Sequence, residues 1–548
     1  MPLLEFSGAQ AVEQRKGNPF ATWGNRTQKN RVEPVTKPGF AVPFQINPED
    51  KIFTVGSCFA RHVEHVLKQR GFQLPMLDLF NKPEFADMNK GIVNNFGTPS
   101  IYNEFAWALG EQDFVAKDHI VETQNNKYID MHVISSIRPT DFDTVLNRRK
   151  AITAAYRSFM ECQVVIITLG LVEVWYDSKT GFYLNSSPRP TMLRNEPDRF
   201  KLHVLSFDEV YSYLEKTVDL IQKHGQENVQ IIVTISPVPL ATTHRTDDVI
   251  VANSYSKSVL RTAAETVIAK RKDVTYYPSF ESVSLSDRKM TWLDDFVHVT
   301  DEIVSVNINR MVDAYVESEW TLEDHRSAIE TGGALMAVER AVKVRQGSQE
   351  DANAFFEAFG DFSKTALDFT LEHAQYLQGL KDFAGVLRVV EMAPEDPHNT
   401  LGLIHADALI KLGKAEEAFD LLTEQSKSGK SAWLLWHHYL EAAKLIGDQD
   451  KVFEVLNRWI EASPSSAGRA NGMVARWFYE IRDYDRALEL FDIGISIDPE
   501  DALIRIYRTE ALLAKLDHTG AQEELARIVP RMPNEKILLG RLKERMQG

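Results

Sequence analysis

The stretch KIFTVGSCFARHVEHVL, residues 51–67, decides the fold of the first part of this 548-residue chain. A short apolar run ends in a glycine and a serine, and a helical pattern begins at once at Phe59. A serine at such a strand-to-helix turn lies beside free backbone N–H groups of the new helix, which can stabilise a developing oxyanion. Ser57 is therefore a candidate nucleophile. The alternative is that Ser57 only caps the helix, which serine does well at this position.

From Lys51 onward, apolar runs alternate with amphipathic helical patterns. The runs are short and rich in Val, Ile or Tyr, as buried parallel strands are. Strands that alternate with helices predict an α/β fold, with a mainly parallel sheet flanked by helices. The expected strands are Lys51–Val55, Val164–Leu169, Val229–Ile235 and Val274–Tyr277, and the expected helices are Phe59–Arg70, Phe207–His224, Ser254–Arg271 and Thr300–Val316. Residues 77–144 have no pattern regular enough to assign.

Beyond Trp320 the strand patterns disappear and a repeat of 34 or 35 residues appears. A small or aliphatic residue is followed four positions later by a large apolar one, and in three copies a proline follows after twelve. These residues are Ala418, Val452, Ala487 and Ala521, then Leu422, Leu456, Phe491 and Leu525, and then Pro464, Pro499 and Pro533. The pattern resembles the tetratricopeptide repeat, most closely at residues 475–501, and residues 381–397 resemble a shortened copy. Stacked helical hairpins predict an all-α solenoid with a concave surface for a protein partner.

These patterns divide the chain into four expected parts. Residues 1–48 are polar and broken by prolines, which predicts an extended N-terminal arm. The α/β domain is expected at residues 49–318, a helical linker at 319–365 and the repeats at 366–548.

Composition and charge exclude several classes of function. The chain has 62 Lys and Arg against 78 Asp and Glu, and a formal net charge of −16 disfavours nucleic-acid binding. The N-terminus lacks the apolar region of a signal peptide, and the most apolar stretch, residues 164–174, is too short to span a bilayer. Two cysteines without metal-ligand spacing suit a reducing compartment. We therefore expect a cytoplasmic protein with no membrane span, no metal and no cofactor.

A second chemical element is WLDDFVHVT, residues 292–300, near the end of the α/β domain. Asp295 and His298 are three residues apart, so in a turn their side chains can face each other. A carboxylate bonded to one imidazole nitrogen leaves the other nitrogen to accept a serine proton. Asp294 is the competing carboxylate, although its spacing of four residues suits a tight turn less well. The order along the chain, a serine after the first strand and the Asp–His pair after the last, favours a nucleophilic site.

At these residues the chain resembles a known family. The run at residues 56–60, Gly-Ser-Cys-Phe-Ala, resembles the motif that gives the GSCFA family its name, a branch of the SGNH/GDSL hydrolase-like superfamily. The resemblance covers roughly residues 18–316 and includes TLGLVEVW (168–175), taken as a strand, SPVP (236–239), ANSYSKSVLR (252–261), YPSFE (277–281) and DDFVH (294–298). It implies that Ser57 is the nucleophile, His298 the general base and Asp295 its orienting partner.

The chain departs from the superfamily pattern at the oxyanion hole, which usually takes a glycine amide and an asparagine side chain. Gly97 in Asn-Phe-Gly could supply the glycine, but the block that begins at Gly170 has no asparagine two residues later. Loss of one such donor costs on the order of a hundredfold in rate. Because a carboxylate would repel an oxyanion, Glu173 is expected to have a structural or substrate-orienting role. Cys58 is an alternative nucleophile, although a free cysteine is more often a small core residue.

The sequence thus favours a serine esterase or O-acyl(acetyl)transferase, and the superfamily resemblance implies a carbohydrate or glycolipid ester as substrate. The expected partners are that ester and a protein bound by the repeats. The alternative is a non-catalytic binding module that acts as a scaffold through its repeats. The two hypotheses differ in whether His298 can reach the Ser57 hydroxyl.

Overall fold

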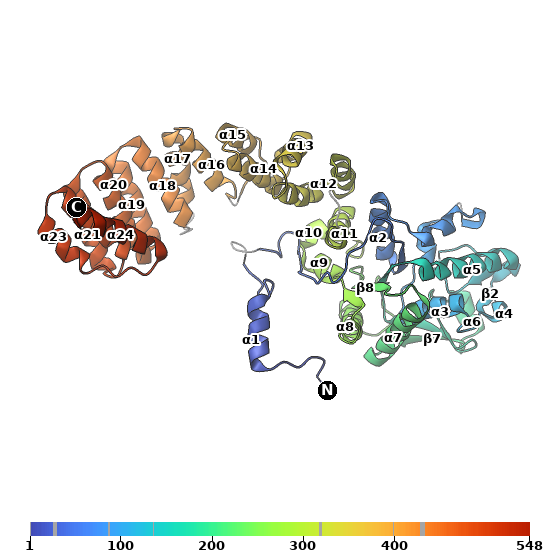
Figure 1. The fold of residues 1–548 in the computed structure, drawn as a ribbon. Coiled ribbons are helices and arrows are strands. Elements are labelled where there is room, and N and C mark those ends of the chain that lie inside the picture. Colours follow the sequence, from blue (N-terminus) through green and yellow to red (C-terminus); the bar gives the residue numbers. More distant parts are fainter. Residues whose placement is uncertain are drawn as a thin grey trace. The chain divides into compact units, whose positions relative to one another are not determined.

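The computed structural model forms two compact units, Met1–Glu339 and Arg340–Gly548, which are described separately below (Figure 1). The residues that the structure describes are 2–25, 30–85, 88–134, 136–316, 320–397, 399–427 and 433–547.

A four-stranded sheet lies at the centre of the first unit. Its order is β1-β4-β8-β9, and all three pairings are parallel. The strands are β1 Ile52–Gly56, β4 Val164–Leu169, β8 Gln230–Ile235 and β9 Val274–Tyr276. In the register, Gly56 pairs with Thr168, which in turn pairs with Thr234, so the carboxyl ends of the strands share one edge. The predicted parallel sheet is confirmed.

The helices predicted around the sheet are present, with small differences at their ends. They are α2 Cys58–Gln69, α7 Phe207–His224, α8 Val249–Ile268 and α11 Asp301–Tyr315. α8 begins five residues before the predicted start because the Asp248 side chain accepts a hydrogen bond from the Ile250 N–H and caps it there. Phe53 and Val55 of β1 are buried in one core with Phe105 of α3 Thr98–Leu109 and Ile152 of α5 Phe142–Arg157.

The unassigned part of the sequence, residues 77–144, consists mainly of short elements. They are the 3-10 helices η1 Pro75–Asn81, η2 Pro83–Phe85, η3 Lys90–Val93 and η4 Gln124–Asn126, the helix α4 Ala116–His119 and the hairpin strands β2 Ile120–Glu122 and β3 Tyr128–Asp130. Elements of three to seven residues are too short for a hydrophobic period to become visible. Only α3 and the start of α5 are longer.

A second, antiparallel sheet of three strands is a feature that the sequence analysis missed. Its order is β6-β5-β7, with β5 Glu173–Asp177, β6 Phe182–Leu184 and β7 Phe200–Val204. The stretch 168–175 is therefore not one strand, because β4 ends at Leu169 and β5 begins at Glu173. The remaining elements of the unit are η5 Ser158–Glu161, α6 Pro190–Asn195, α9 Ser279–Leu285 and α10 Arg288–Thr291.

The N-terminal segment contains one exposed helix, α1 Gly8–Gly17, and then runs along the α/β domain. The Thr36 N–H donates to Ser286 Oγ at 2.8 Å, and the Ile46 N–H donates to the Tyr315 carbonyl at 2.7 Å. Thr36 and Ile46 are both buried. Backbone hydrogen bonds and burial together hold this part of the segment against α9 and α11.

The second unit is all-helical, and its helices pack in consecutive pairs (Figure 1). After α12 Leu322–Val344, which crosses the boundary between the units, the helices are α13 Gln349–Phe359, η6 Gly360–Lys364, α14 Leu367–Gly379, α15 Phe383–Glu391, α16 Gly402–Lys411, α17 Ala415–Ser426, α18 Trp433–Ile446, α19 Gln449–Ala462, η7 Pro464–Ser466, α20 Ala467–Glu480, α21 Tyr484–Ile497, α22 Ala502–Ala514, α23 His518–Leu525 and α24 Pro533–Gln547.

The repeat positions from the sequence occupy the interfaces between these helices. Ala418, Val452, Ala487 and Ala521 are all fully buried. Pro464 and Pro499 follow the ends of α19 and α21, whereas Pro533 begins α24. A small buried residue in each pair lets the helices approach closely, as the tetratricopeptide-like period predicted.

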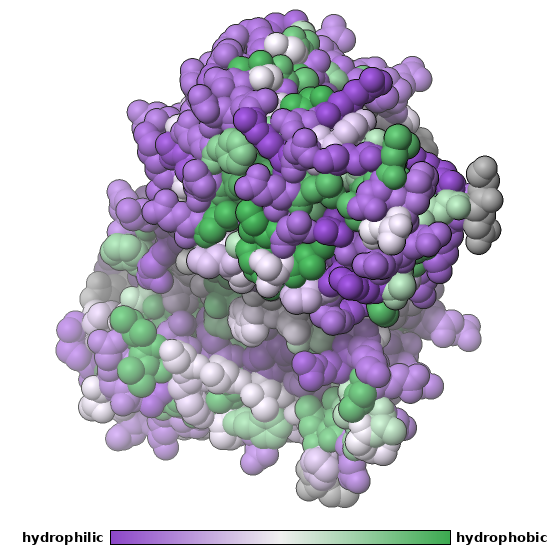
Figure 2. All heavy atoms as spheres, turned by 90° about the vertical axis from the view of Figure 1, so that its left-hand side faces the viewer, coloured by the Kyte–Doolittle hydropathy of each residue, from purple (hydrophilic) through white to green (hydrophobic). Residues whose placement is uncertain are grey.

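Hydrophilic residues cover most of the surface drawn in Figure 2, and hydrophobic residues form smaller groups among them. None of the helices in the described ranges combines the length and apolar character that a bilayer crossing requires.

Candidate active site

The turn after β1 holds Ser57 in a strained and crowded place. Gly56 has φ +133°, and a Cβ there would lie 2.1 Å from the Thr168 carbonyl oxygen, so only glycine fits. The Ser57 N–H donates to that oxygen at 3.1 Å. Ser57 Oγ accepts from the Phe59 N–H at 3.4 Å, and the residue is 2% exposed. The capping role considered from the sequence is thus present, at the same edge of the sheet where ligands of parallel folds bind.

Gly97, the candidate oxyanion-hole glycine, and Gly170, the first residue of the block without the asparagine, lie together beside this turn. The Asn95 N–H donates to the Gly56 carbonyl at 2.7 Å, and the Leu171 N–H donates to the Phe96 carbonyl at 3.0 Å. Gly97 and Leu171 form a parallel bridge, and a Cβ at Gly170 would lie 2.9 Å from the Phe96 oxygen. The structure therefore brings Gly97 and Gly170 to the carboxyl edge of β1 and β4.

An asparagine that the sequence analysis did not single out holds this loop in place. Asn185 Oδ1 accepts from the Phe96 N–H at 3.0 Å, and Asn185 Nδ2 donates to the Asn94 carbonyl at 2.6 Å. Asn185 follows β6, far along the chain from the loop, so no local spacing could have revealed it. Asn95 is buried, and its Oδ1 accepts from Ser100 Oγ at 2.5 Å.

Asp295 and His298 form the expected pair. His298 Nδ1 lies 2.6 Å from Asp295 Oδ2, and Asp295 Oδ1 accepts from the Val297 and His298 N–H groups at 3.0 and 2.9 Å. The hydrogen bond from His298 is the largest of the contacts that lower the pKa of Asp295 to about 2. An ionised Asp295 bonded to Nδ1 leaves Nε2 of His298 as the proton acceptor. No hydrogen bond involves Asp294 in the described residues.

His298 and Ser57 are not joined by a hydrogen bond in the part of the chain that the structure describes. The His298 side chain is 65% exposed, whereas Ser57 is buried. The helix that follows His298, α11, nevertheless packs on α2. Burial lowers the pKa of His62 in α2. Asp301, at the start of α11, lies near enough to His62 to oppose this shift. The segment 292–300 thus leads directly into the helix that packs on α2.

Glu173 is engaged with the chain rather than free for an oxyanion. Its Oε1 accepts from Thr243 Oγ1 at 2.6 Å, and its Oε2 accepts from the His244 N–H at 3.0 Å. Glu173 therefore fixes the loop after β8. It also lines a cleft of about 260 Å³ together with Gly97, Leu171 and Asn185. The cleft begins directly beside the glycine loop.

Lys257 of α8 is a further residue whose importance the sequence did not reveal. Its Nζ is buried and donates to the carbonyls of Gly170, Ser236 and Val238 at 3.0, 2.8 and 2.7 Å. Burial lowers the pKa of Lys257 to about 7, and the Cys58 thiol opposes this shift. Lys257 thus ties the ends of β4 and β8 together. The sequence contained one signal for this role, a lysine on a helix face that is buried, because lysine is almost never buried unless it is paired.

Cys58 does not have the surroundings of a thiolate nucleophile. Burial is the main cause that raises the pKa of its thiol, although the neighbouring Phe59 N–H and Lys257 oppose the shift. Reactive cysteines instead have a lowered thiol pKa. Cys58 therefore fits the role of a small packed residue.

The parallel sheet with its flanking helices is an α/β domain of the SGNH-like fold class. Residues 51–311 match the GSCFA family model, so this part of the chain is a GSCFA-family domain.

Two solved structures resemble the chain weakly. One is a tetratricopeptide repeat protein from Parabacteroides merdae ATCC 43184, 14% identical over 44% of this chain and 96% of that chain, with a TM-score of 0.28. The other is the structure of Naa15/Naa10 bound to HypK-THB, 12% identical over 62% of this chain and 57% of that chain, with a TM-score of 0.20. No curated protein matches the chain. The assignment of the repeats rests on their spacing and on the buried positions described above.

Proposed function

We propose that the GSCFA-family domain is a serine esterase or O-acyl(acetyl)transferase that acts on a carbohydrate or glycolipid ester. The observation that carries this proposal is the bond of 2.6 Å between His298 and Asp295, in a segment that leads into the helix packed against α2. An ionised carboxylate that fixes the imidazole tautomer supports general-base catalysis, and the same carboxylate also accepts two backbone N–H groups that hold the turn.

In the proposed reaction, Ser57 Oγ attacks the ester carbonyl carbon while His298 Nε2 takes the hydroxyl proton. The tetrahedral intermediate collapses as the same proton passes to the leaving alcohol, and an acyl-serine remains. Water or a sugar hydroxyl then attacks the acyl-serine, and its proton returns through His298 to the serine. This reaction requires that His298 Nε2 reaches Ser57 Oγ when substrate binds, because no hydrogen bond joins the two side chains in the described residues.

In this proposal the remaining site residues position the loops and the cleft around the substrate. The Gly97 loop lies beside the reacting carbonyl, and Lys257 positions the Gly170 carbonyl and hence the chain next to it. The cleft of about 260 Å³ receives the substrate, and Glu173 and Asn185 hold its walls.

The test is turnover of p-nitrophenyl acetate by the purified protein and by Ser57→Ala, His298→Ala and Cys58→Ala variants. We expect the first two variants to lose turnover and Cys58→Ala to keep it, with circular dichroism unchanged. Turnover that survives Ser57→Ala, or a wild-type protein without turnover on any ester, would favour the non-catalytic binding module.

A second function is favoured by the repeat unit. A groove of about 640 Å³ is lined by Trp433, Arg469, Arg476, Trp477 and Tyr507. The Arg469 and Arg476 guanidiniums lie over the rings of Trp433 and Tyr507, 4.4 and 4.5 Å from their centroids. We propose that a segment of a protein partner binds here, since aromatic and arginine side chains dominate interface energies. A Tyr507→Ala variant should lose a co-purifying partner that wild type retains, with ester turnover unchanged.

A further inference from the structure

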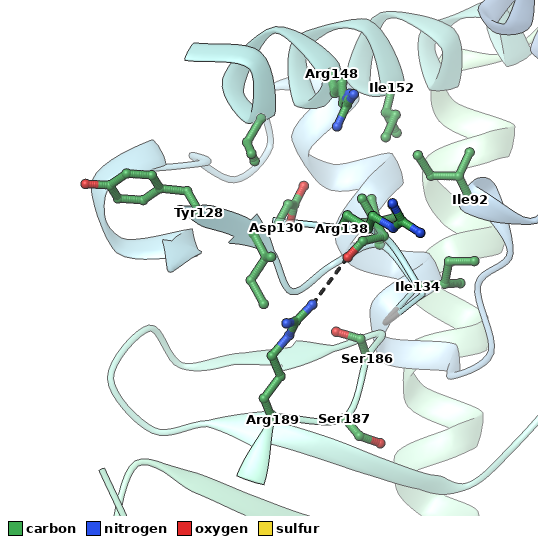
Figure 3. A pocket seen from close by; sticks show the side chains of 14 residues that line it. Ile92, Tyr128, Asp130, Ile134, Arg138, Arg148, Ile152, Ser186, Ser187 and Arg189 are labelled. Carbon is green, nitrogen blue, oxygen red and sulfur yellow. Dashed lines mark hydrogen bonds between the residues drawn. The ribbon is translucent and has the colours of Figure 1, made fainter. Parts of the chain in front are cut away.

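Three arginines, of which Arg138 is exposed, line part of a small cavity in the α/β domain, and most of the remaining lining is aliphatic. Arg148 of α5 and Arg189, the residue before α6, extend towards the cavity from opposite sides, and Arg138 lies between them (Figure 3). The cavity measures about 40 Å³, whereas one water needs about 10–15 Å³ on this measure, so a small polyatomic ion has room. Ser186 and Ser187 supply hydroxyl groups to the same lining.

None of these arginines forms an ion pair in the described part of the chain. Arg189 Nη2 donates to the Ile137 carbonyl at 3.3 Å, a neutral partner. Arg148 Nε is buried with no hydrogen-bond partner. Burial lowers the pKa of the Arg148 guanidinium, and Asp141 and Glu84 only partly offset this from a distance.

The next residue of the same helix, Arg149, is paired with two carboxylates, whereas Arg148 is paired with none in the described residues. Arg149 is buried between Glu104 and Asp130, with N–O distances of 2.6 Å to each. Asp130 also lines the cavity, but its Oδ2 bonds Arg149 and its Oδ1 accepts from the His132 N–H at 2.9 Å. That carboxylate is therefore committed elsewhere.

A bound anion would give these arginines a direct counter-charge, because the carboxylate in the same lining, Asp130, is already bonded to Arg149. The chain as a whole has a net charge of −16, yet this lining has three arginines against one carboxylate, an excess of two positive charges. Guanidinium groups bind phosphoryl oxygens through paired, charge-assisted hydrogen bonds, and three of them match a group with two or more negative charges.

We propose that this arginine pocket, formed by Arg138, Arg148 and Arg189 with Ser186 and Ser187, binds the phosphoryl group of a small phosphorylated molecule. The pocket shares Ile134, Ser186 and Ser187 with the cleft beside Gly97, so the rest of the ligand extends along that wall. The binding itself does not depend on ester hydrolysis.

Isothermal titration of the full chain with pyrophosphate tests the proposal, in low-salt buffer with NaCl of equal ionic strength as the reference. We expect binding to wild type, and binding about tenfold or more weaker in Arg148→Gln and in Arg189→Gln. Lys150→Gln is the matched control, because Lys150 is an exposed cation on the same helix and lies outside the lining. Ser57→Ala should bind as wild type does.

The same variants give a second readout, which is the free energy of unfolding without and with pyrophosphate. Because Arg148 forms no ion pair in the described residues and its Nε has no hydrogen-bond partner, Arg148→Gln should unfold no more easily than Lys150→Gln without pyrophosphate, while losing the stabilisation that pyrophosphate gives wild type. A wild-type dissociation constant weaker than about 1 mM, or equal affinity in Arg148→Gln and Lys150→Gln, would overturn the proposal whatever the ester turnover shows.

Discussion

Replacing Lys257 by methionine tests how the carboxyl edge of the sheet is held together. Lys257 Nζ is buried and donates to three backbone carbonyls, at the ends of two neighbouring strands. Methionine fills a similar volume but supplies no donor and no charge. The variant therefore loses three hydrogen bonds from the charged ammonium, or two from the neutral amine, and also loses the penalty of a buried cation, and these two effects oppose each other at neutral pH.

The pH dependence separates the two effects. Burial lowers the pKa of Lys257 to about 7 from the ordinary value of 10.5, so between these values the unfolded chain binds the proton and the folded chain does not. The folded state then gains stability as pH rises. The stability gained in this way is fully present above pH 10.5. It decreases as pH falls from 10.5 and is lost once pH has fallen through 7. At about 1.4 kcal/mol per pH unit, wild type should gain about 4 kcal/mol over Lys257→Met between pH 7 and pH 10.

Urea denaturation of both proteins at pH 7, 8, 9 and 10 measures this difference. Lys272→Met serves as the control, because Lys272 is exposed and its removal should leave the pH dependence of wild type unchanged. A difference between wild type and Lys257→Met that stays constant across the series would refute the argument, since Lys257 would then keep its proton in the folded chain. We also expect Lys257→Met to reduce ester turnover at pH 8, because the Gly170 carbonyl loses its anchor.

Three further changes have defined outcomes. Arg149→Met leaves two buried carboxylates unpaired and should lower the free energy of unfolding by about 3–5 kcal/mol in urea titration, and a loss below about 1 kcal/mol would contradict the pairing. Gly56→Ala places a Cβ against the Thr168 carbonyl at a positive φ and should cost at least about 2 kcal/mol by thermal unfolding, whereas an unchanged melting temperature would show that the turn can adapt. Asp295→Asn should lower kcat for p-nitrophenyl acetate by at least about a hundredfold with folding intact, because His298 loses its fixed tautomer; equal kcat would remove Asp295 from the mechanism.

The strands and helices of the α/β domain were predictable because each carries its own pattern. β4 is a continuous apolar run, and α7 has a capping box at Ser206 and Glu209, so both could be recognised without knowledge of their neighbours. The antiparallel sheet was missed because β6 has only three residues and no hydrophobic period. The Asp295–His298 contact was predicted because it is local, within one turn of chain.

The supporting contacts of the candidate site could not be predicted in the same way. Asn185 reaches Asn94 and Phe96 across a long stretch of chain, and Lys257 reaches Gly170 from another helix. Such contacts depend on how loops close over the sheet edge, which no spacing in the sequence records. The unpaired arginines of the pocket are likewise visible only when the side chains around them are known.

The sequence by itself determined the parallel α/β domain, the repeat array, the glycine-serine turn and the Asp–His pair, because local periodicity and short-range geometry specify each of them. Only the tertiary structure decided that Ser57 is buried while His298 is exposed, that Glu173 holds a loop and that Lys257 joins two strands. Burial and long-range hydrogen bonds arise from packing between segments far apart in the chain, and a linear pattern carries no information on that packing.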